Sequence, residues 1–156
     1  MDRETRLRAR KKALALLTDM DRTEAQLTEK LARAGFDEEA VRDAVEYVRG
    51  YGYINDARYA DHYIEIMKES RSRRRIVQDL TMKKGLSGHE VEEALSRTGG
   101  WDERPLILRL AKKKLRTLHG DAEERRRKTA AYLMRQGFAA PDVMRVLEML
   151  SFGEEE

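Results

Sequence analysis

Four short blocks of basic residues are the groups in this sequence whose type and spacing favour binding chemistry. They read RARKK, RSRRR, KKKLR and RRRK and occupy residues 8–12, 71–75, 112–116 and 125–128. Clustered guanidinium and ammonium groups bind phosphates and carboxylates, and arginine does so through paired hydrogen bonds. The acidic residues are scattered or stand at expected helix starts, and the net charge is only +3. The blocks therefore indicate a polyanion or an acidic protein surface as the ligand.

Catalytic or metal chemistry finds little support in the sequence. The three histidines, His62, His89 and His119, lie far apart along the chain, and there is no cysteine. No zinc-protease, phosphate-loop or serine-hydrolase motif is present. Acidic residues on helices this charged are mostly solvated or paired with Lys and Arg. We therefore expect a protein that is not an enzyme, with no metal site and no cofactor.

An internal repeat predicts the elements that position the basic blocks. Three segments align, RAGFDEEAVRDAV at 33–45, KKGLSGHEVEEAL at 83–95 and RQGFAAPDVMRVL at 135–147, with glycines about fifty residues apart. A large apolar residue follows each glycine, and a valine comes six positions after it. A glycine just past a helix can take the left-handed conformation that ends it, and the apolar residue and the valine have the spacing of a hydrophobic staple. Each segment is therefore predicted to be a tight corner between two helices.

The residues after each glycine differ in how well they begin the next helix. Asp37 and Ser87 are good N-caps, and Ser87 with Glu90 makes a capping box. Ala139 is a poor N-cap, because it has no side-chain acceptor. The third corner is therefore a degraded copy.

Another helix is predicted before each corner. Thr23 with Gln26 caps it in the first copy, and Asp121 with Glu124 caps it in the third. Its buried face is marked by Leu27, Leu31, Ile76, Leu80 and Leu133. The leucine at 80 lies five residues before its glycine, whereas those at 31 and 133 lie four before theirs. The second copy therefore carries an extra residue or a shifted face here.

A third amphipathic segment precedes each pair, at about 4–19, 56–70 and 103–118. Three helices per copy predict an all-α fold, an elongated array of three tandem three-helix repeats with about nine helices in total. We place the repeats at residues 1–54, 55–100 and 101–156. A unit of about fifty residues buries little apolar surface alone, so neighbouring copies are expected to stack. No stretch approaches the roughly 18 apolar residues of a membrane span, so we expect no membrane contact. We also expect a cytoplasmic protein, because it has no cysteine, and a monomer, as repeat arrays of this size often are.

The stretch YGYINDARYA, at 51–60, stands between the first two copies. Gly50 or Gly52 is expected to end the last helix of the first copy, and Asn55 or Asp56 to cap the first helix of the second. The stretch is therefore predicted to be a joint, and we expect its tyrosines to pack between the repeats.

Two pairs of basic blocks occupy equivalent positions of this repeat. Arg73–Arg75 and Arg125–Arg127 lie ten to twelve residues before their glycines, and Arg10–Lys12 corresponds to Lys112–Lys114. If Ser72 is an N-cap, the arginines after it fill a first helical turn, where the helix dipole disfavours cations by a few tenths of a kcal/mol each. A polyanion or an acidic surface would explain arginine there. The alternative is that a helix-rich surface simply needs charge.

The central part of the chain resembles the RecX family, bacterial regulators of the RecA recombinase. The resemblance rests on GYINDARYA at 52–60, SRRRIVQDL at 72–80 and KKGLSGHEVEEAL at 83–95, and the threefold repeat extends it over nearly the whole chain. The sequence departs from the family pattern in two places, where SRSRRR stands in place of a glycine-containing linker and in the extra residue before the glycine at 85. The most specific residues, expected to be mainly structural, are Gly52, Tyr53, Asn55, Asp56, Arg58, Tyr59, Ala60 and Gly85.

The resemblance implies a non-enzymatic modulator that binds RecA and lies along the groove of its filament on single-stranded DNA. Such a protein restrains recombination, ATP hydrolysis and the SOS response. Repeated basic blocks suit a nucleoprotein surface, and an elongated helical array suits a long groove. We expect the blocks of the middle and third copies to contact DNA phosphates or acidic recombinase side chains. These residues are Arg71, Arg73, Arg74, Arg75, Lys112, Lys113, Lys114, Arg116, Arg125, Arg126, Arg127 and Lys128.

The alternative function is an autonomous nucleic-acid-binding module, in which a helix after a corner enters the major groove of bare DNA. Those helices begin with DEEAVRDAVEY and SGHEVEEAL, and they would present glutamates to the phosphates. The acidic character of these helices therefore favours the filament regulator.

Overall fold

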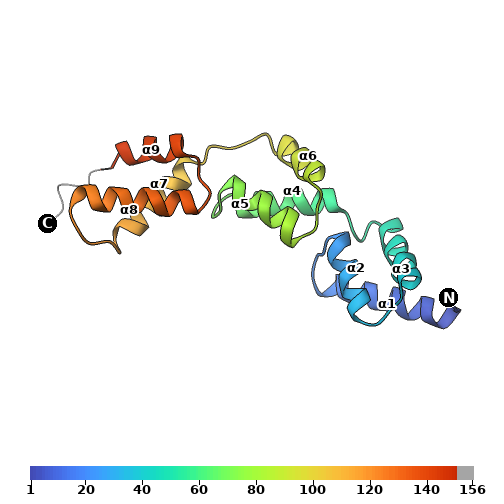
Figure 1. Ribbon diagram of the computed structural model, residues 1–156. Coiled ribbons are helices and arrows are strands. Elements are labelled where there is room, and N and C mark those ends of the chain that lie inside the picture. The colour runs from blue at the N-terminus through green and yellow to red at the C-terminus, as the bar shows by residue number, and fades with distance from the viewer. Residues whose placement is uncertain (151–156) are drawn as a thin grey trace. The chain divides into compact units, whose positions relative to one another are not determined.

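The computed structural model describes residues 1–150, and this part of the chain is all-α (Figure 1). Its nine α-helices are α1 Arg3–Asp19, α2 Glu24–Arg33, α3 Glu38–Gly50, α4 Asp56–Met67, α5 Arg73–Gln78, α6 Gly88–Thr98, α7 Arg104–Leu115, α8 Ala122–Arg135 and α9 Ala140–Glu148. A π-helical turn, η1 Asp79–Lys83, directly follows α5. The predicted fold class and number of helices are confirmed. The last residues of the predicted third repeat, 151–156, lie outside the described range.

The chain divides into two compact units. Among the described residues, the first contains residues 1–64 and 78–98, and the second contains residues 65–77 and 99–150. The residues predicted as a middle repeat, 55–100, are therefore shared between the two units. The repeat boundaries after residues 54 and 100 stay a prediction.

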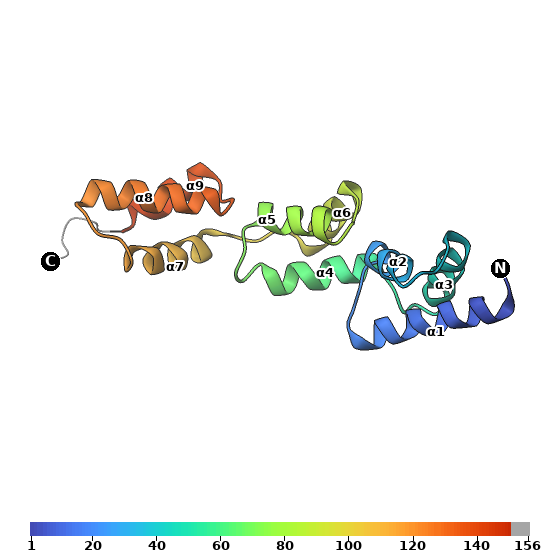
Figure 2. The same ribbon diagram turned by 60° about the horizontal axis from the view of Figure 1, so that its bottom comes forward.

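The core of the first unit lies between α1, α2 and α3, with α1 running beside α3 (Figure 2). Only alanines of α1, Ala9 and Ala13, are fully buried against it, while leucines on either side of that face are half-buried. The buried residues of this core are Ala9, Ala13, Leu27, Leu31, Ala40, Val41, Ala44, Val45, Val48 and Ile54.

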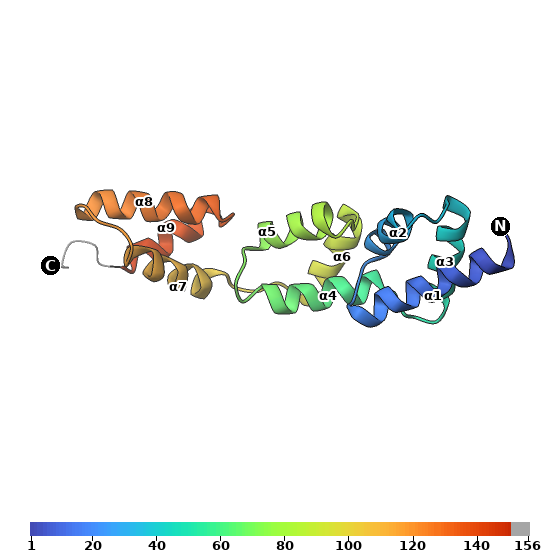
Figure 3. The same ribbon diagram turned by 90° about the horizontal axis from the view of Figure 1, so that it is seen from below.

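The core of the second unit lies between α7, α8 and α9, each of which packs against the other two (Figure 3). Its buried residues are Leu106, Ile107, Ala111, Leu133, Phe138, Val143, Val146 and Leu147. The three predicted staple valines, Val41, Val91 and Val143, are all buried. The hydrophobic pattern therefore identified the inner faces of these helices correctly.

The glycine corners have the predicted backbone conformation. The φ angles of Gly35, Gly85 and Gly137 are +99°, +78° and +99°, in the left-handed region. The helix starts also agree, since Ser87 and Glu90 form both bonds of the capping box and Ala139 makes no side-chain cap. Local sequence thus determines both sides of each corner.

The extra residue of the second copy lies in the π-helical turn η1. The backbone N–H of Lys84 donates to the carbonyl of Asp79 at 3.0 Å, five residues back, and Leu86 N–H donates to the carbonyl of Leu80. A π-helical turn spaces its hydrogen bonds five residues apart, one more than an α-helix, and so takes up an inserted residue. Leu80 consequently stays fully buried.

In the first unit, a buried hydroxyl joins a helix start to a distant glycine corner. Thr23 Oγ1 accepts a hydrogen bond from the N–H of Gln26, which caps α2, and donates one to the carbonyl of Lys84 at 2.5 Å. Thr23 is fully buried, and the residue after Lys84 is the corner glycine, Gly85. We call this contact the hydroxyl–carbonyl joint.

The second unit contains a hydroxyl–carbonyl joint at the equivalent position. Ser72 Oγ accepts from the N–H of Arg75 at the start of α5 and donates to the carbonyl of Gln136 at 2.7 Å, next to Gly137. Ser72 is 1% exposed. The corresponding N-cap of α8, Asp121, accepts from Glu124 N–H, but an ionised carboxylate has no proton to give to a carbonyl. The joint therefore requires Ser or Thr.

Gly137→Ala is expected to destabilise the protein more than Gly35→Ala. Both glycines have a φ of +99°, so a side chain at either position costs about 1–2 kcal/mol in backbone strain. A Cβ at Gly137 would lie 2.6 Å from Ser72 Oγ, whereas a Cβ at Gly35 meets nothing within 4 Å. The clash adds about 1–3 kcal/mol, as overpacking does. Denaturant unfolding of the two variants measures the difference, and equal losses would contradict the role of the joint.

Candidate functional site

Arg73, in the middle basic block, is held by contacts within the second unit. Its backbone N–H donates to Glu103 Oε2 at 2.7 Å, and its guanidinium lies 4.5 Å from the centroid of the Trp101 ring and donates to the Trp101 carbonyl. A cation–π contact contributes about 0.5–2 kcal/mol, more than the few tenths lost to the helix dipole. Local structure therefore explains an arginine at this position, without a polyanion.

The other arginines of this block differ in exposure. Arg75 is exposed, and its Nη1 donates to Gln136 Oε1 at 2.9 Å. Arg74 is exposed, and its side chain forms no hydrogen bond or ion pair with any other residue in the range 1–150. Arg71 is half-buried. Arg74 and Arg75 are thus the members of this block that an external ligand can reach most easily.

The block on α7 is also partly structural. Lys112 and Lys113 are exposed in the last turn of the helix, where the dipole favours cations, and Arg116 is exposed just beyond it. Lys114 is half-buried, with its Nζ 4.9 Å from the centroid of the Tyr132 ring. Three cations of this block therefore face solvent and one supports the packing of α7 on α8.

The block on α8 begins in the first turns of that helix. Arg125 and Arg126 are half-buried, and Arg126 Nη1 donates to the carbonyl of Leu147 at 3.1 Å. Arg127 is exposed, and Lys128 forms an ion pair with Glu124 at 2.9 Å. Only a short loop joins α7 to α8, so this block lies at the same end of the second unit as the block on α7 (Figure 3).

All of the basic residues predicted to bind belong to the second unit. Arg75 lies near the C-terminal end of α8, because its guanidinium binds Gln136, the C-cap of that helix. The other two blocks lie near the N-terminal end of α8. A helix of this length spans about 20 Å. The second unit therefore carries two cationic groups of residues, about one helix length apart.

In the first basic block, Arg10 is paired with Asp43. Its Nε and Nη2 donate to the two carboxylate oxygens at 2.9 and 3.0 Å, and its guanidinium lies 4.4 Å from the centroid of the Tyr47 ring. The hydrogen bonds from Arg10 lower the pKa of Asp43 below its ordinary value, against the opposing effect of partial burial.

Most residues of the stretch at 51–60 end or begin a helix as predicted. Helix α3 ends at Gly50, and Gly52 takes the left-handed conformation, with a φ of +74°. Asn55 Oδ1 accepts from the N–H of Arg58, so Asn55 is the N-cap of α4. Ala60 is buried, and Tyr59 stacks on Tyr63 with the ring centroids 6.2 Å apart.

The expectation that the tyrosines of this stretch pack between repeats is wrong for Tyr51 and Tyr53. Their exposed fractions are 63% and 52%. Only Tyr59 is half-buried. The turn that Gly52 makes aims the first two rings outward, which the helical periodicity could not show.

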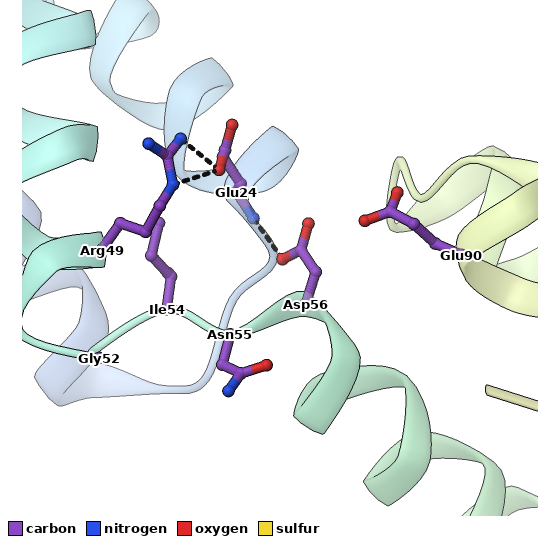
Figure 4. Close-up of a pocket in the computed structure, with 7 residues that line it drawn as sticks. All are labelled: Glu24, Arg49, Gly52, Ile54, Asn55, Asp56 and Glu90. Atoms are coloured by element: carbon purple, nitrogen blue, oxygen red, sulfur yellow. Dashed lines mark hydrogen bonds and ion pairs between the residues drawn. The ribbon is translucent and has the colours of Figure 1, made fainter. Parts of the chain in front are cut away.

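Asp56 lines a pocket of about 400 Å³ in the first unit (Figure 4). Its Oδ1 accepts from the backbone N–H of Glu24, the first residue of α2, at 3.0 Å, and Arg49 binds the Glu24 carboxylate. Burial raises the pKa of Asp56 above its ordinary value, and the carboxylates of Glu90 and Glu24 raise it further, although the hydrogen bond from Glu24 N–H opposes the shift. Asp56 therefore serves as a second cap on α2, and its ionised form is disfavoured by burial and by the neighbouring carboxylates.

Residues 1–150 contain neither a membrane-spanning helix nor a cluster of metal-binding side chains. No helix in this range is long and apolar enough to cross a membrane. No group of three or more His, Asp or Glu side chains in this range is arranged to hold a metal ion.

Comparison with known proteins gives a consistent family. A model described as RecX, first three-helix domain, matches residues 9–47, and one described as RecX, third three-helix domain, matches residues 102–147. A regulatory protein RecX of Clostridium perfringens is 30% identical over 135 residues, which are 85% of this chain and 63% of that protein. A regulatory protein RecX of Caldanaerobacter subterraneus is 31% identical, over 90% of this chain and 70% of its own length. The one from Streptomyces coelicolor is 31% identical, over 89% and 75%.

Two solved structures have a similar fold. The crystal structure of RecX from Lactobacillus salivarius matches with a TM-score of 0.79 and 21% identity, and the match covers 94% of this chain and 97% of that one. A crystal structure of a regulatory protein RecX matches with a TM-score of 0.83 and 24% identity, covering 92% and 73%. The chain spans less than two thirds of the C. perfringens protein, at 63% of its length.

Asp56→Asn is expected to stabilise the protein near neutral pH. The amide oxygen can still accept the bond from Glu24 N–H, and the raised pKa means that ionised Asp56 is unfavourable in the fold. A carboxyl whose folded pKa lies above the unfolded one loses stability as pH rises through the folded pKa. The advantage of Asn should therefore vanish below about pH 4, where both states are protonated. Melting temperatures of the wild type and the variant across this range test it.

Asp43→Asn is the control with the opposite sign. The pKa of Asp43 is lowered, so its carboxylate contributes stability above the unfolded pKa and loses it as pH falls through the folded one. This variant should be less stable than the wild type at neutral pH, and the gap should close in acid. The same sign for both variants would contradict the electrostatic assignment.

Proposed function

The chain belongs to the RecX family, and from this premise we propose that it is a regulatory protein that binds the filament of the RecA recombinase on single-stranded DNA. By doing so it restrains strand exchange, ATP hydrolysis and the SOS response. The protein acts by binding and performs no chemical step itself.

The observation that carries the proposal is a set of exposed cations in the second unit that form no ion pair with any residue between 1 and 150. They are Arg74, Arg75, Lys112, Lys113, Arg116 and Arg127. An unpaired surface cation remains available to phosphates or carboxylates, whereas a paired one must first break its pair. These exposed cations lie near both ends of α8, so one extended anionic surface can contact both groups.

The structure supports a division of labour among the basic residues predicted to bind. Arg73, Lys114 and Arg126 contact Trp101, Tyr132 and the Leu147 carbonyl inside the second unit. We assign them the role of holding the helices that present the exposed cations. The exposed cations then make the direct contacts.

The proposed function is tested by RecA-dependent ATP hydrolysis on single-stranded DNA. Addition of this protein should lower the steady-state rate, with saturation as the filament is covered. An unchanged rate at a concentration that saturates filament binding would contradict the proposal.

Replacing Arg74 and Arg75 together by Ala should weaken this inhibition about tenfold, if each contact contributes on the order of 0.7 kcal/mol. The melting temperature should fall little, because both side chains are exposed. Replacing Arg33 and Arg42 together by Ala is a charge-matched control, because both are exposed arginines of the first unit, and it should leave inhibition unchanged. Wild-type inhibition by the double variant would show that these arginines are not the contact residues.

A module that acts on bare DNA would behave differently. It would bind single-stranded DNA no more tightly when the recombinase is present, and its affinity would fall steeply as salt rises. A filament regulator should bind more tightly and with less salt dependence when the recombinase is present. The helices that such a module would insert, α3 and α6, present exposed Glu38, Glu39, Glu90 and Glu92 near their starts, which disfavours that mode.

A further inference from the structure

Three tyrosines form a row of rings at the end of α3 in the first unit. The centroids of Tyr47 and Tyr51 are 5.2 Å apart with the rings at 67°, and those of Tyr51 and Tyr53 are 5.7 Å apart with the rings at 16°. Tyr51 and Tyr53 are 63% and 52% exposed. We call these residues the tyrosine ladder. The rings of Tyr51 and Tyr53 are nearly parallel, and both side chains are exposed.

Backbone hydrogen bonds fix the ladder. The N–H of Gly52 donates to the Arg49 carbonyl at 2.9 Å, and the N–H of Tyr53 donates to the Val48 carbonyl at 3.0 Å. The left-handed conformation of Gly52 turns the chain back, so that Tyr53 lies beside Tyr51, while Ile54 is buried below the turn. Because the backbone of this turn is fixed and the two rings already stack on each other, the pair loses little conformational entropy when it binds.

Both paired and unpaired arginines lie beside the ladder. Arg10 lies against Tyr47, and Arg10 and Arg6 share a single carboxylate, Asp43. At the other end, Arg58 Nη2 lies 3.4 Å from the Gly52 carbonyl and forms no ion pair with another described residue. Glu46 adds one exposed carboxylate on α3, near Arg49. Exposed, stacked rings beside the guanidinium of Arg58 match a ligand that has flat bases joined by phosphates.

We propose that the tyrosine ladder is a stacking surface for the bases of single-stranded DNA, with Arg58, which is exposed and forms no ion pair with another described residue, placed to meet a phosphate. Surfaces that bind single strands combine aromatic rings for the bases with cations for the backbone. The choice of DNA as the ligand rests on the proposed function. The assignment adds to it a second contact region, outside the basic blocks of the second unit.

The test compares two ligands and two variants by fluorescence anisotropy, using the full chain without recombinase. The ligands are a labelled thymidine oligonucleotide and an abasic oligonucleotide of the same length, which keeps the phosphates and lacks the bases. The variants are Tyr51→Ala with Tyr53→Ala, and Tyr51→Phe with Tyr53→Phe, which retains both rings. Wild type should prefer the thymidine oligonucleotide. The alanine variant should lose about tenfold or more on that ligand and little on the abasic one, while the phenylalanine variant keeps the preference.

Several results would overturn the assignment. They are equal binding of both oligonucleotides by the wild type, no binding of either, or an equal loss on both by the alanine variant. An alanine variant that keeps its preference for bases but no longer inhibits the recombinase would assign the ladder to a protein surface instead. Because the recombinase is absent from the DNA measurement, the ladder can fail while inhibition of ATP hydrolysis holds, and the reverse.

Discussion

The fold depends on a buried hydroxyl that serves two backbone groups at once. Thr23 and Ser72 each accept from an N–H at a helix start and donate to a carbonyl more than sixty residues away. Each carbonyl precedes a glycine at which a Cβ would lie within 2.6 Å of a neighbouring side-chain atom. The glycines therefore do more than supply a left-handed φ, because the missing Cβ leaves room for Ser72 Oγ at Gly137 and for the Ala25 side chain at Gly85. A buried carbonyl left without its donor would cost about 1–3 kcal/mol, comparable with the loss of a helix cap.

The joint in the second unit also determines which basic residues remain available. Ser72 places the first turn of α5 against the corner at Gly137, where Arg75 meets Gln136 and Arg73 meets Trp101. Arginine is unfavourable in a first helical turn, and these contacts offset that cost for two of the three. Arg74 has no such compensation within the described residues. Local stability therefore does not explain an arginine at position 74, whereas contact with an external anion would.

Sequence reasoning succeeded where the physics is local. Helix caps, left-handed glycines and buried faces depend on residues within a few positions of one another, so Asp37, Gly85 and Leu133 were assigned correctly. The sequence shows that a residue is inserted before Gly85, but it does not show that the insertion forms a π-helical turn. Contacts between distant segments were missed, including the bond from Thr23 to Lys84 and the ring of Trp101 under Arg73. The outward direction of Tyr51 and Tyr53 was missed because it depends on the turn at Gly52 and not on helical period.

The two proposed contact regions rely on forces that respond differently to salt. Each phosphate that a cation of the second unit neutralises releases counterions, so this part of the affinity weakens as ionic strength rises. Stacking of a base on Tyr51 or Tyr53 releases no counterion, and the arginines beside the ladder contribute fewer charges than the blocks around α8. A chain with both regions therefore keeps the base-dependent part of its affinity at salt concentrations that remove most of the phosphate-dependent part. The cations would govern how fast the chain meets an anionic filament, and the rings would govern how long it stays where bases are accessible.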